Sequence, residues 1–425
     1  MNYIIQFSQQ TFASLKIRNY RLYFIGQGLS MCGTWMQTVA LGWLVLTLTG
    51  SGTKLGIVMA FQYFPMLIGG LWGGSIVDRF SKRHILYVTQ SILALLALCM
   101  SILVWTNTIT IDLIYLFAFL TGLVTAVDNP ARQTFVHETV GRENLRNAVT
   151  LASTENNLAR AIGPLIAGTL IAGVGIAACF LFNALSFIAV LVILSLIRVQ
   201  DLHLEHSLEK KTRTKRSILS YIASKPEIKH VLILIAILGT VTYEFQISLP
   251  LIAQKTFLGD AATYATLLSA MGIGSVVGGM LVAGRKKTSF KEFVIAVFCI
   301  GLSMCVTAIM PTLALAALGM LFVGFFSIQV LSVGNTIVQL GSSEEMRGRT
   351  MSLWSMAMFG STLVGGPLIG VIAEYFGARW GLGFGGIVAI VCAIVVAITM
   401  YGFKHLYNRM RKASISFLYE DILHR

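Results

Sequence analysis

Three ionisable side chains lie in segments that are otherwise apolar enough to cross a membrane: Glu155, Arg160 and Glu244. An ionised group at membrane depth costs several kcal/mol, so each is a candidate for function. A carboxyl group withdrawn from water holds a proton more readily, which suits reversible proton binding. Glu155 is the first candidate because it lies nearest the middle of its expected helix, and Glu244 is the second. Arg160 would oppose protonation of Glu155 if it came close. The alternatives are a structural ion pair with a neighbouring helix for Glu155 and Arg160, which do not face each other at five residues' spacing, and contact with the outer membrane interface for Glu244.

A second charged cluster follows a charge-free run, residues 55–77. Residues 74–83 read Gly-Ser-Ile-Val-Asp-Arg-Phe-Ser-Lys-Arg. Such a glycine lets two helices approach, the aspartate places an anion at a helix end, and the basic residues hold the loop on one side of a membrane. The alternative is an ordinary basic loop. The spacing predicts a gating loop formed by Gly74, Asp78, Arg79, Lys82 and Arg83.

The elements that position these residues are expected to be membrane helices. Mean hydropathy is +0.78, and only 12% of the 425 residues are charged. A soluble chain could not bury so many apolar segments. The longest charge-free runs exceed the roughly 20 residues of a spanning helix and the roughly 10 of a barrel strand. With polar-interrupted segments near 112–133, 146–160 and 231–255, we predict twelve spans.

The net charge of +14 is unevenly distributed along the chain. All but four of the 32 Lys and Arg residues fall in alternate loops and the two terminal segments, the exceptions being Lys54, Arg160, Lys255 and Arg379. This asymmetry predicts that both termini are cytoplasmic and that the basic face meets the anionic inner leaflet. It excludes nucleic-acid binding, because no aromatic residues interleave with the basic ones to read bases.

The chain divides near its middle and repeats. A polar, basic stretch predicts a linker at 198–229 between bundles at 1–197 and 230–403, with a cytoplasmic tail at 404–425. Gly-Pro-Leu-Ile occurs at 163–166 and again at 366–369, each preceded by a basic loop at a matching distance. Small residues let helices approach and proline bends them. We therefore predict hinges at Gly163, Pro164, Gly366 and Pro367, with simple close packing as the alternative.

These motifs resemble those of the major facilitator superfamily, although Ser81 replaces a glycine expected in the loop at 74–83. Residues 128–133 (Asp-Asn-Pro-Ala-Arg-Gln), 33–37, 157–164 and 347–349 are similar to the subgroup of enterobactin exporters and multidrug permeases. The resemblance implies an all-α integral membrane fold with twelve helices in two pseudo-symmetric six-helix bundles. Asp128 and Arg132 are expected to border the cytoplasm beside Asp78 and Arg79, so we assign them to the gate, together with Arg349.

In that fold, helices 1, 4, 7 and 10 line a central cavity. The polar and aromatic residues that the resemblance assigns to it are Gln27, Trp35, Gln37, Tyr243, Phe245, Gln246, Gln329 and Asn335. An aromatic and amide lining with few charges suits a large amphipathic solute. For Trp35 the alternative is an anchor at the membrane interface.

We therefore predict a secondary transporter in a bacterial inner membrane that exports a siderophore or drug by alternating access and proton antiport. The alternatives are a proton-coupled importer of a metabolite and, more distantly, a receptor or scaffold. No nucleotide-binding or nucleophile motif indicates an enzyme. We expect no cofactor and no metal site, six free cysteines, and a monomer in the lipid bilayer with a small molecule and protons as its partners.

Overall fold

The computed structural model describes residues 13–203, 218–283 and 288–402. These residues form helices joined by short turns and contain no strand. An apolar run adopts a helix in a membrane because a helix satisfies its own backbone hydrogen bonds. The long helices of the first half are α2 (Arg18–Thr49), α3 (Gly52–Arg79), α4 (Lys82–Trp105), α5 (Ile111–Gly173) and α6 (Ile176–Leu196), with the short turns η1 (Ala13–Lys16) and η2 (Val199–Asp201) at either side.

Helix α5 is 63 residues long and consists of two arms. The break is at Gly141, whose φ of 69° lies in the left-handed region that glycine adopts without steric cost. The loop expected between 133 and 146 is therefore a kink inside one helical element. The first arm carries Asp128 and Arg132, and the second arm returns with Glu155 and Arg160.

The second half contains two interrupted helices. Residues 242–244 separate α8 from α9, and the π-helical turn η4 separates α13 from α14. The elements are α7 (Ile218–Ala223), α8 (Pro226–Val241), α9 (Phe245–Leu251), η3 (Ile252–Thr256), α10 (Ala261–Ala283), α11 (Phe290–Ala308), α12 (Leu313–Gly341), α13 (Glu344–Ser355), η4 (Met356–Gly360), α14 (Thr362–Tyr375), α15 (Ala378–Ala397) and η5 (Ile398–Gly402). The predicted linker contains η2 and α7. Its residues 204–217 lie outside the described part of the chain, as does the predicted tail 404–425.

The chain is an all-α membrane protein. Ten helical segments of the described part are long and apolar enough to cross a bilayer. One of them is α5, whose two arms run in opposite directions, and α3 adds a further helix of 28 residues. The segments are consistent with the predicted twelve spans.

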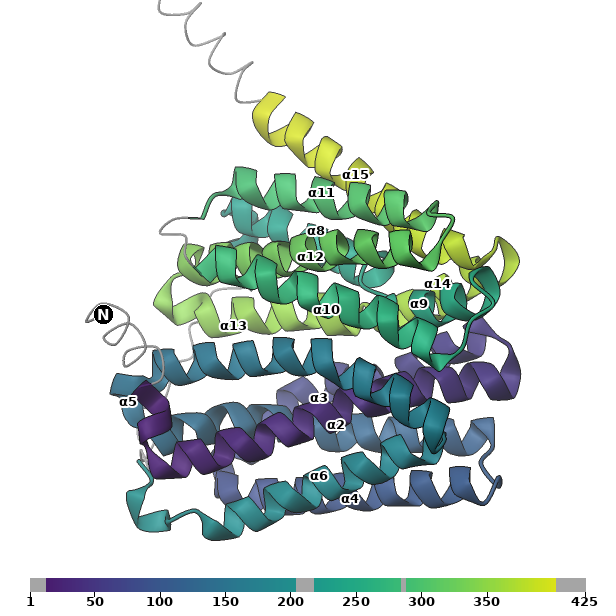
Figure 1. The fold of residues 1–425 in the computed structure, drawn as a ribbon. Coiled ribbons are helices and arrows are strands. Elements are labelled where there is room, and N and C mark those ends of the chain that lie inside the picture. The colour runs from purple at the N-terminus through teal and green to yellow at the C-terminus, as the bar shows by residue number, and fades with distance from the viewer. Residues whose placement is uncertain (1–12, 204–217, 284–287, 403–425) are drawn as a thin grey trace, which may run out of the picture.

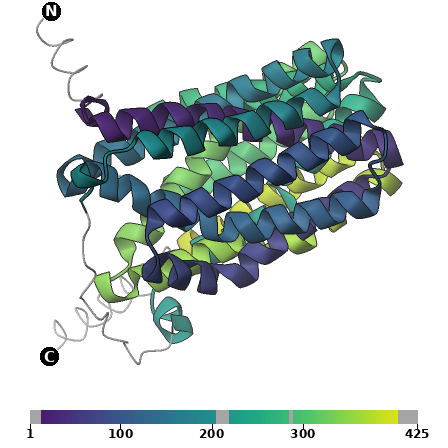
Figure 2. The same cartoon turned by 90° about the horizontal axis from the view of Figure 1, so that it is seen from below.

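The helices run side by side, with α2–α6 in one layer of the drawing and α8–α15 in the other (Figure 1). Figure 2 shows the same bundle from below, with the helices again running lengthwise. Successive helices place their turns at alternate ends. We call the end that holds residues 79–83, 138–146 and 198–203 the basic end. The other end, with residues 50–53, 174–175 and 376–377, is called the opposite end.

The two halves meet along two helix pairs, α5 with α10 and α3 with α14. Glycine makes both contacts possible, because the backbones approach too closely for a side chain. A Cβ atom on Gly272 of α10 would lie 2.6 Å from the Cα of Ala161 in α5. On the other pair, a Cβ on Gly56 of α3 would overlap the carbonyl oxygen of Gly366 in α14.

Candidate functional site

A cavity with a volume of about 390 Å³, here called the main cavity, lies among the helices of the first half. This volume lies within the range typical of small-molecule sites. Its walls come mostly from α2 to α6, and among the described residues the second half contributes Gln246 and Phe359. Its amide side chains are Gln37, Gln62, Asn129, Asn156, Asn183 and Gln246.

Three of the residues predicted to line a cavity do line it: Trp35, Gln37 and Gln246. The amide of Asn183 donates to Gln37 Oε1 at 2.7 Å, which joins α6 to α2. The indole Nε1 of Trp35 donates to Asn156 Oδ1 at 3.4 Å. These contacts form a polar wall in an otherwise apolar cavity. In small-molecule sites, such polar groups fix the orientation of a ligand, whereas the apolar lining supplies most of the affinity.

The other predicted lining residues lie elsewhere. Gln27 lines a second cavity described below. Tyr243 donates its hydroxyl to the backbone oxygen of Ser327, and Phe245 is buried beside it. Gln329 and Asn335 are carried by α12 and are not among the lining residues of the main cavity. Prediction from helix number alone missed Gln62, Asn156 and Asn183. The sequence does contain a signal for these three residues, because each is an amide side chain inside a segment that is otherwise largely apolar.

Asp128 and Arg132 form a buried ion pair inside the first half. Asp128 is 1% exposed, and it accepts hydrogen bonds from Thr89 Oγ1 at 2.6 Å and Gln90 Nε2 at 2.8 Å. Arg132 also donates to Gln27 Oε1. A buried charge is tolerated when its hydrogen bonds are satisfied, and here α2, α4 and α5 supply them. These two residues brace the helices of one half, and their role in a gate remains a prediction.

A second cavity of about 190 Å³ lies beside the first, and we call it the tyrosine pocket. It shares Met31, Asn129 and Arg132 with the main cavity. Its other lining residues are Tyr20, Tyr23, Phe24 and Gln27 of α2, Gln133 and Val136 of the first arm of α5, and Ala152 and Glu155 of the second arm.

Glu155 and Arg160 are not paired with each other. The described part of the chain contains no ion pair from either residue within 4.0 Å. The Arg160 guanidinium instead lies 5.3 Å from the Trp35 ring centroid, a cation–π distance, and its Nη2 is 3.9 Å from Met271 Sδ. The structural ion pair considered from the sequence is therefore not formed here, and Glu155 keeps its carboxylate in the tyrosine pocket.

Glu244 lies at the break between α8 and α9 and is only 4% exposed. Its carboxylate receives a hydrogen bond from the Thr362 side chain of α14, whereas Oε1 is buried without a hydrogen-bond partner. Contact with the outer membrane interface, the alternative from the sequence, does not fit this burial. The residue lies where two interrupted helices of the second half meet.

At the basic end, the residues of the predicted gating loop contact different partners. Lys82 lies 3.9 Å from Glu138, and Arg83 donates to the backbone oxygen of Leu194 at 2.8 Å. Asp78 and Arg79 are exposed at the end of α3, where Asp78 makes no hydrogen bond or ion pair to another described residue. Gly74 lies within α3, and Arg349 is exposed on α13.

The opposite end is held together across the halves. The Glu374 carboxylate at the end of α14 accepts hydrogen bonds from Ser51 Oγ at 2.7 Å, the Thr53 backbone amide at 3.0 Å and Thr53 Oγ1 at 2.8 Å. The carboxylate also lies at the N-terminus of α3, where it interacts favourably with the partial positive charge of that helix end.

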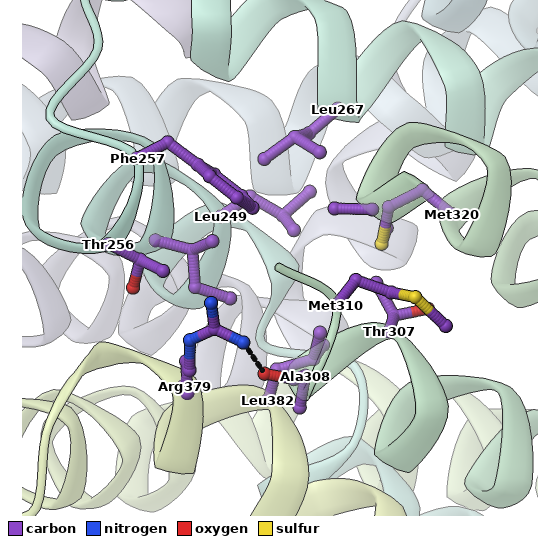
Figure 3. Close-up of a pocket in the computed structure, with 12 residues that line it drawn as sticks. Leu249, Thr256, Phe257, Leu267, Thr307, Ala308, Met310, Met320, Arg379 and Leu382 are labelled. Atoms are coloured by element: carbon purple, nitrogen blue, oxygen red, sulfur yellow. Dashed lines mark hydrogen bonds between the residues drawn. The ribbon is translucent and has the colours of Figure 1, made fainter. Parts of the chain in front are cut away.

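A small pocket lies beside Arg379 at the opposite end. Arg379 Nη1 donates to the backbone oxygen of Ala308 at 2.8 Å (Figure 3). The pocket beside it has a volume of about 10 Å³, enough for one water molecule and no larger ligand.

The predicted hinge residues lie at close helix contacts. A Cβ on Gly163 of α5 would lie 2.8 Å from Trp35 Cβ, and one on Gly366 of α14 would lie 2.8 Å from the Gly56 oxygen. Pro164 and Pro367 follow these glycines inside their helices. Close packing is thus present at both sites, and hinge motion stays a prediction.

Known proteins resemble the chain over most of its length. The staphyloferrin A transporter of Staphylococcus aureus is 25% identical over 362 residues, which cover 84% of this chain and 90% of the relative. The multidrug efflux pump Tap of Mycolicibacterium fortuitum is 24% identical, covering 81% and 87%. The enterobactin exporter EntS of Escherichia coli O1:K1 is 23% identical, covering 91% and 93%.

Solved structures show the same fold. A bacterial homologue of the human lysosomal transporter Spinster, in an inward-facing and unoccupied conformation, has a TM-score of 0.68 at 14% identity and covers 89% of this chain and 95% of its own. The POT family transporter PepTSo has a TM-score of 0.70 at 14% identity and covers 92% and 99%.

The family described as transmembrane secretion effectors matches residues 9–412. Together with the relatives and the apolar helices, this indicates a multi-pass protein of a bacterial inner membrane that transports a small molecule, as predicted, and excludes the enzyme class. The chain belongs to the transmembrane secretion effector family of the major facilitator superfamily.

Proposed function

We propose that the protein exports an amphipathic small molecule, a siderophore or drug, by alternating access driven by proton antiport. The main cavity carries this proposal. It combines aromatic and amide side chains with the buried Asp128–Arg132 pair, so that a solute with an apolar body and several polar groups would be complemented. Relatives named as a siderophore transporter, a siderophore exporter and a drug efflux pump support the same class of cargo.

The asymmetry between the two ends supports alternating access. Contacts between the halves close the opposite end through Gly56, Gly366 and Glu374, whereas Asp78 at the basic end is exposed. The excess of Lys and Arg at the basic end supports a cytoplasmic location for it. The conformation then corresponds to an inward-facing state that receives cargo from the cytoplasm.

Proton antiport needs a carboxylate that binds either a proton or cargo. Glu155 is the better candidate because its carboxylate lines a cavity that adjoins the main cavity. Glu244 is buried and hydrogen-bonded to Thr362, and it lines neither cavity.

The test is flux of labelled cargo in inverted membrane vesicles with an imposed pH gradient. Catecholate siderophores, carboxylate siderophores and amphipathic cations would be offered separately. Export predicts uptake into inverted vesicles that are acidic inside, and loss of that uptake when an ionophore collapses the gradient. Gradient-driven movement in the other direction would identify an importer and overturn the proposal.

A further inference from the structure

We propose that the Arg160 guanidinium binds the carboxylate head group of an amphipathic cargo whose apolar body occupies the main cavity. The inference deepens the proposed export by naming an anionic class of cargo, and it rests on that proposal for its physiological meaning. The binding itself follows from the unpaired charge of Arg160 and from its position where the two halves meet.

Arg160 carries a positive charge that the described part of the chain leaves uncompensated. No carboxylate of the described residues lies within 4.0 Å of it. The ionisable groups that act on it are the hydroxyls of Tyr63 and Tyr243, which are uncharged near neutral pH. Its Nε is buried without a hydrogen-bond partner. A buried charge without an ionic partner is costly, so an anion that reaches the guanidinium is stabilised there.

One edge of the guanidinium has the shape that a carboxylate requires. Nε and Nη2 lie on the same edge and can donate two parallel hydrogen bonds to the two carboxylate oxygens. In the structure, Nη2 of Arg160 instead lies 3.9 Å from the sulfur of Met271, which is a weak acceptor. Methionine is unbranched and flexible, so its sulfur can yield this position to a carboxylate.

Arg160 lies on the same side of α5 as a residue of the main cavity. Asn156 lines that cavity and precedes Arg160 by four residues, about one helical turn. Trp35 contacts both, because its indole Nε1 donates to Asn156 Oδ1 and its ring centroid lies 5.3 Å from the guanidinium. The Arg160 side chain is partly exposed. The guanidinium therefore lies beside the Trp35 wall of the main cavity, within reach of a bound cargo.

The charges of the main cavity favour a ligand with a single negative charge. The charged residues that line it are Asp128 and Arg132, which form an ion pair with each other. Glu155 lines the tyrosine pocket, and Glu244 lines neither cavity. Among the described residues, Arg160 thus adds one uncompensated positive charge beside the cavity. This charge matches a carboxylate and repels a cationic ligand.

The site also joins the two halves. Arg160 precedes a close contact between α5 and α10, where a Cβ on Gly272 would lie 2.6 Å from the Cα of Ala161. Phe359 reaches the main cavity from the second half and stacks on Tyr63 of α3, with ring centroids 6.2 Å apart. Cargo bound here would contact both halves, and transporters that alternate access bind their cargo at such an interface.

The experiment is equilibrium binding of three labelled probes to the full-length protein in a neutral detergent near neutral pH. Naphthoate supplies a carboxylate, naphthamide a neutral amide and naphthylmethylammonium a cation, all on the same ring system. We expect saturable binding of naphthoate, about tenfold weaker binding of naphthamide, and the weakest binding for the cation. Absence of naphthoate binding, equal affinity for naphthamide, or preference for the cation would each overturn the proposal.

Variants of Arg160 test whether this residue makes the distinction. Arg160→Met removes the charge, so naphthoate should lose about tenfold in affinity and its preference over naphthamide should disappear. Arg160→Lys keeps the charge and loses the planar fork, so an intermediate preference is expected. Arg146→Gln is the matched control, because Arg146 is exposed on the same arm of α5. A full preference for naphthoate in Arg160→Met would place the anion elsewhere and overturn the proposal.

Thermal unfolding separates a binding group from a structural one. Because the guanidinium has no ion-pair partner, Arg160→Met should unfold at the wild-type temperature or above it when no ligand is present. Naphthoate should raise the unfolding temperature of the wild type and leave that of Arg160→Met unchanged. A variant that unfolds earlier and is still stabilised by naphthoate would make Arg160 a structural residue. If Arg160→Met does not fold, an undiminished naphthoate preference in Arg160→Lys would overturn the proposal.

The proposed site and the proposed export fail separately. A naphthoate preference that depends on Arg160, without gradient-driven flux, would disprove export and retain the site. Gradient-driven flux of amphipathic cations, without this preference, would retain export and disprove the site.

Discussion

The two ends of the bundle use different means to connect the halves. At the opposite end, backbones touch at Gly56 and Gly366, and the Glu374 carboxylate joins α14 to α3. At the basic end, the contacts that involve the charged loop stay within the first half, as for Lys82 with Glu138 and Arg83 with Leu194. We infer that the halves pivot about the opposite end, because the contacts of Lys82 and Arg83 at the basic end do not join the two halves.

The largest effect is expected from filling the closest contact of the opposite end. Gly56→Ala would force a Cβ against the Gly366 oxygen, and overpacking costs about 1–3 kcal/mol. We expect loss of transport and faster labelling of a cysteine placed in α3 at this end. Gly173→Ala is the control, since a Cβ there meets nothing within 4 Å. Normal flux in Gly56→Ala would mean that this contact does not close the protein.

Glu155→Gln should abolish gradient-driven efflux, because the amide cannot exchange a proton. The carboxylate lies in the pocket rather than in a helix contact, so the protein should insert and fold normally. Glu244→Gln, its matched counterpart in the second half, should retain most of the flux. Vesicle flux under a pH gradient measures both. The reverse pattern would move proton coupling to the break between α8 and α9.

Asp78→Asn should reduce transport about tenfold while membrane insertion stays intact. The exposed carboxylate is expected to meet the backbone amides at the start of α13, which carry a partial positive charge, when the basic end closes, an interaction that a neutral amide makes more weakly. Flux normalised to the amount of inserted protein measures this effect. Wild-type flux in Asp78→Asn would remove Asp78 from the gate.

Glu374→Gln should open the opposite end modestly. The carboxylate accepts three hydrogen bonds, one from Ser51 before α3 and two from Thr53 in its first turn. Replacing it by an amide costs about 1 kcal/mol or less at an exposed site, a shift of about fivefold at most. Cysteine labelling at this end should accelerate by that factor. Glu345→Gln, exposed on α13, serves as the control. If the two variants label at equal rates, the carboxylate contributes nothing to closure.

The smallest effect concerns the turn before α10, outside the membrane. The Asp260 carboxylate accepts a hydrogen bond from the backbone amide of Thr263, and this hydrogen bond holds the pKa of Asp260 below its usual range. A carboxyl group whose pKa is lower in the folded than in the unfolded state stabilises the fold at pH values above its unfolded-state pKa. This stabilisation is lost as the pH falls through the folded-state pKa. Asp260→Ala should cost about 0.5 kcal/mol at neutral pH and nothing in acid. Thermal unfolding in detergent at both pH values checks this difference.

Much of the architecture was predictable because it depends on local properties. Runs of apolar residues set the helices. The predicted charge cluster at 74–83 extends from the end of α3 through the turn at 80–81 into the start of α4, so its residues are mostly helical and do not form a separate loop. The direction in which side chains point was harder to predict from the sequence. Trp35 and Gln37 line the main cavity as expected, yet Gln329 and Asn335 do not, because a helix number does not fix how a helix is rotated.

The sequence by itself determined that this chain is a helical membrane transporter, since hydropathy, charge asymmetry and short motifs are carried by neighbouring residues. Only the tertiary structure decided which polar groups satisfy one another. Arg132 meets Gln27 across 105 positions, and Asn183 meets Gln37 across 146. Such pairs depend on how distant helices pack and rotate. The same packing placed the Arg160 guanidinium beside the Trp35 ring and the Glu155 carboxylate in the tyrosine pocket.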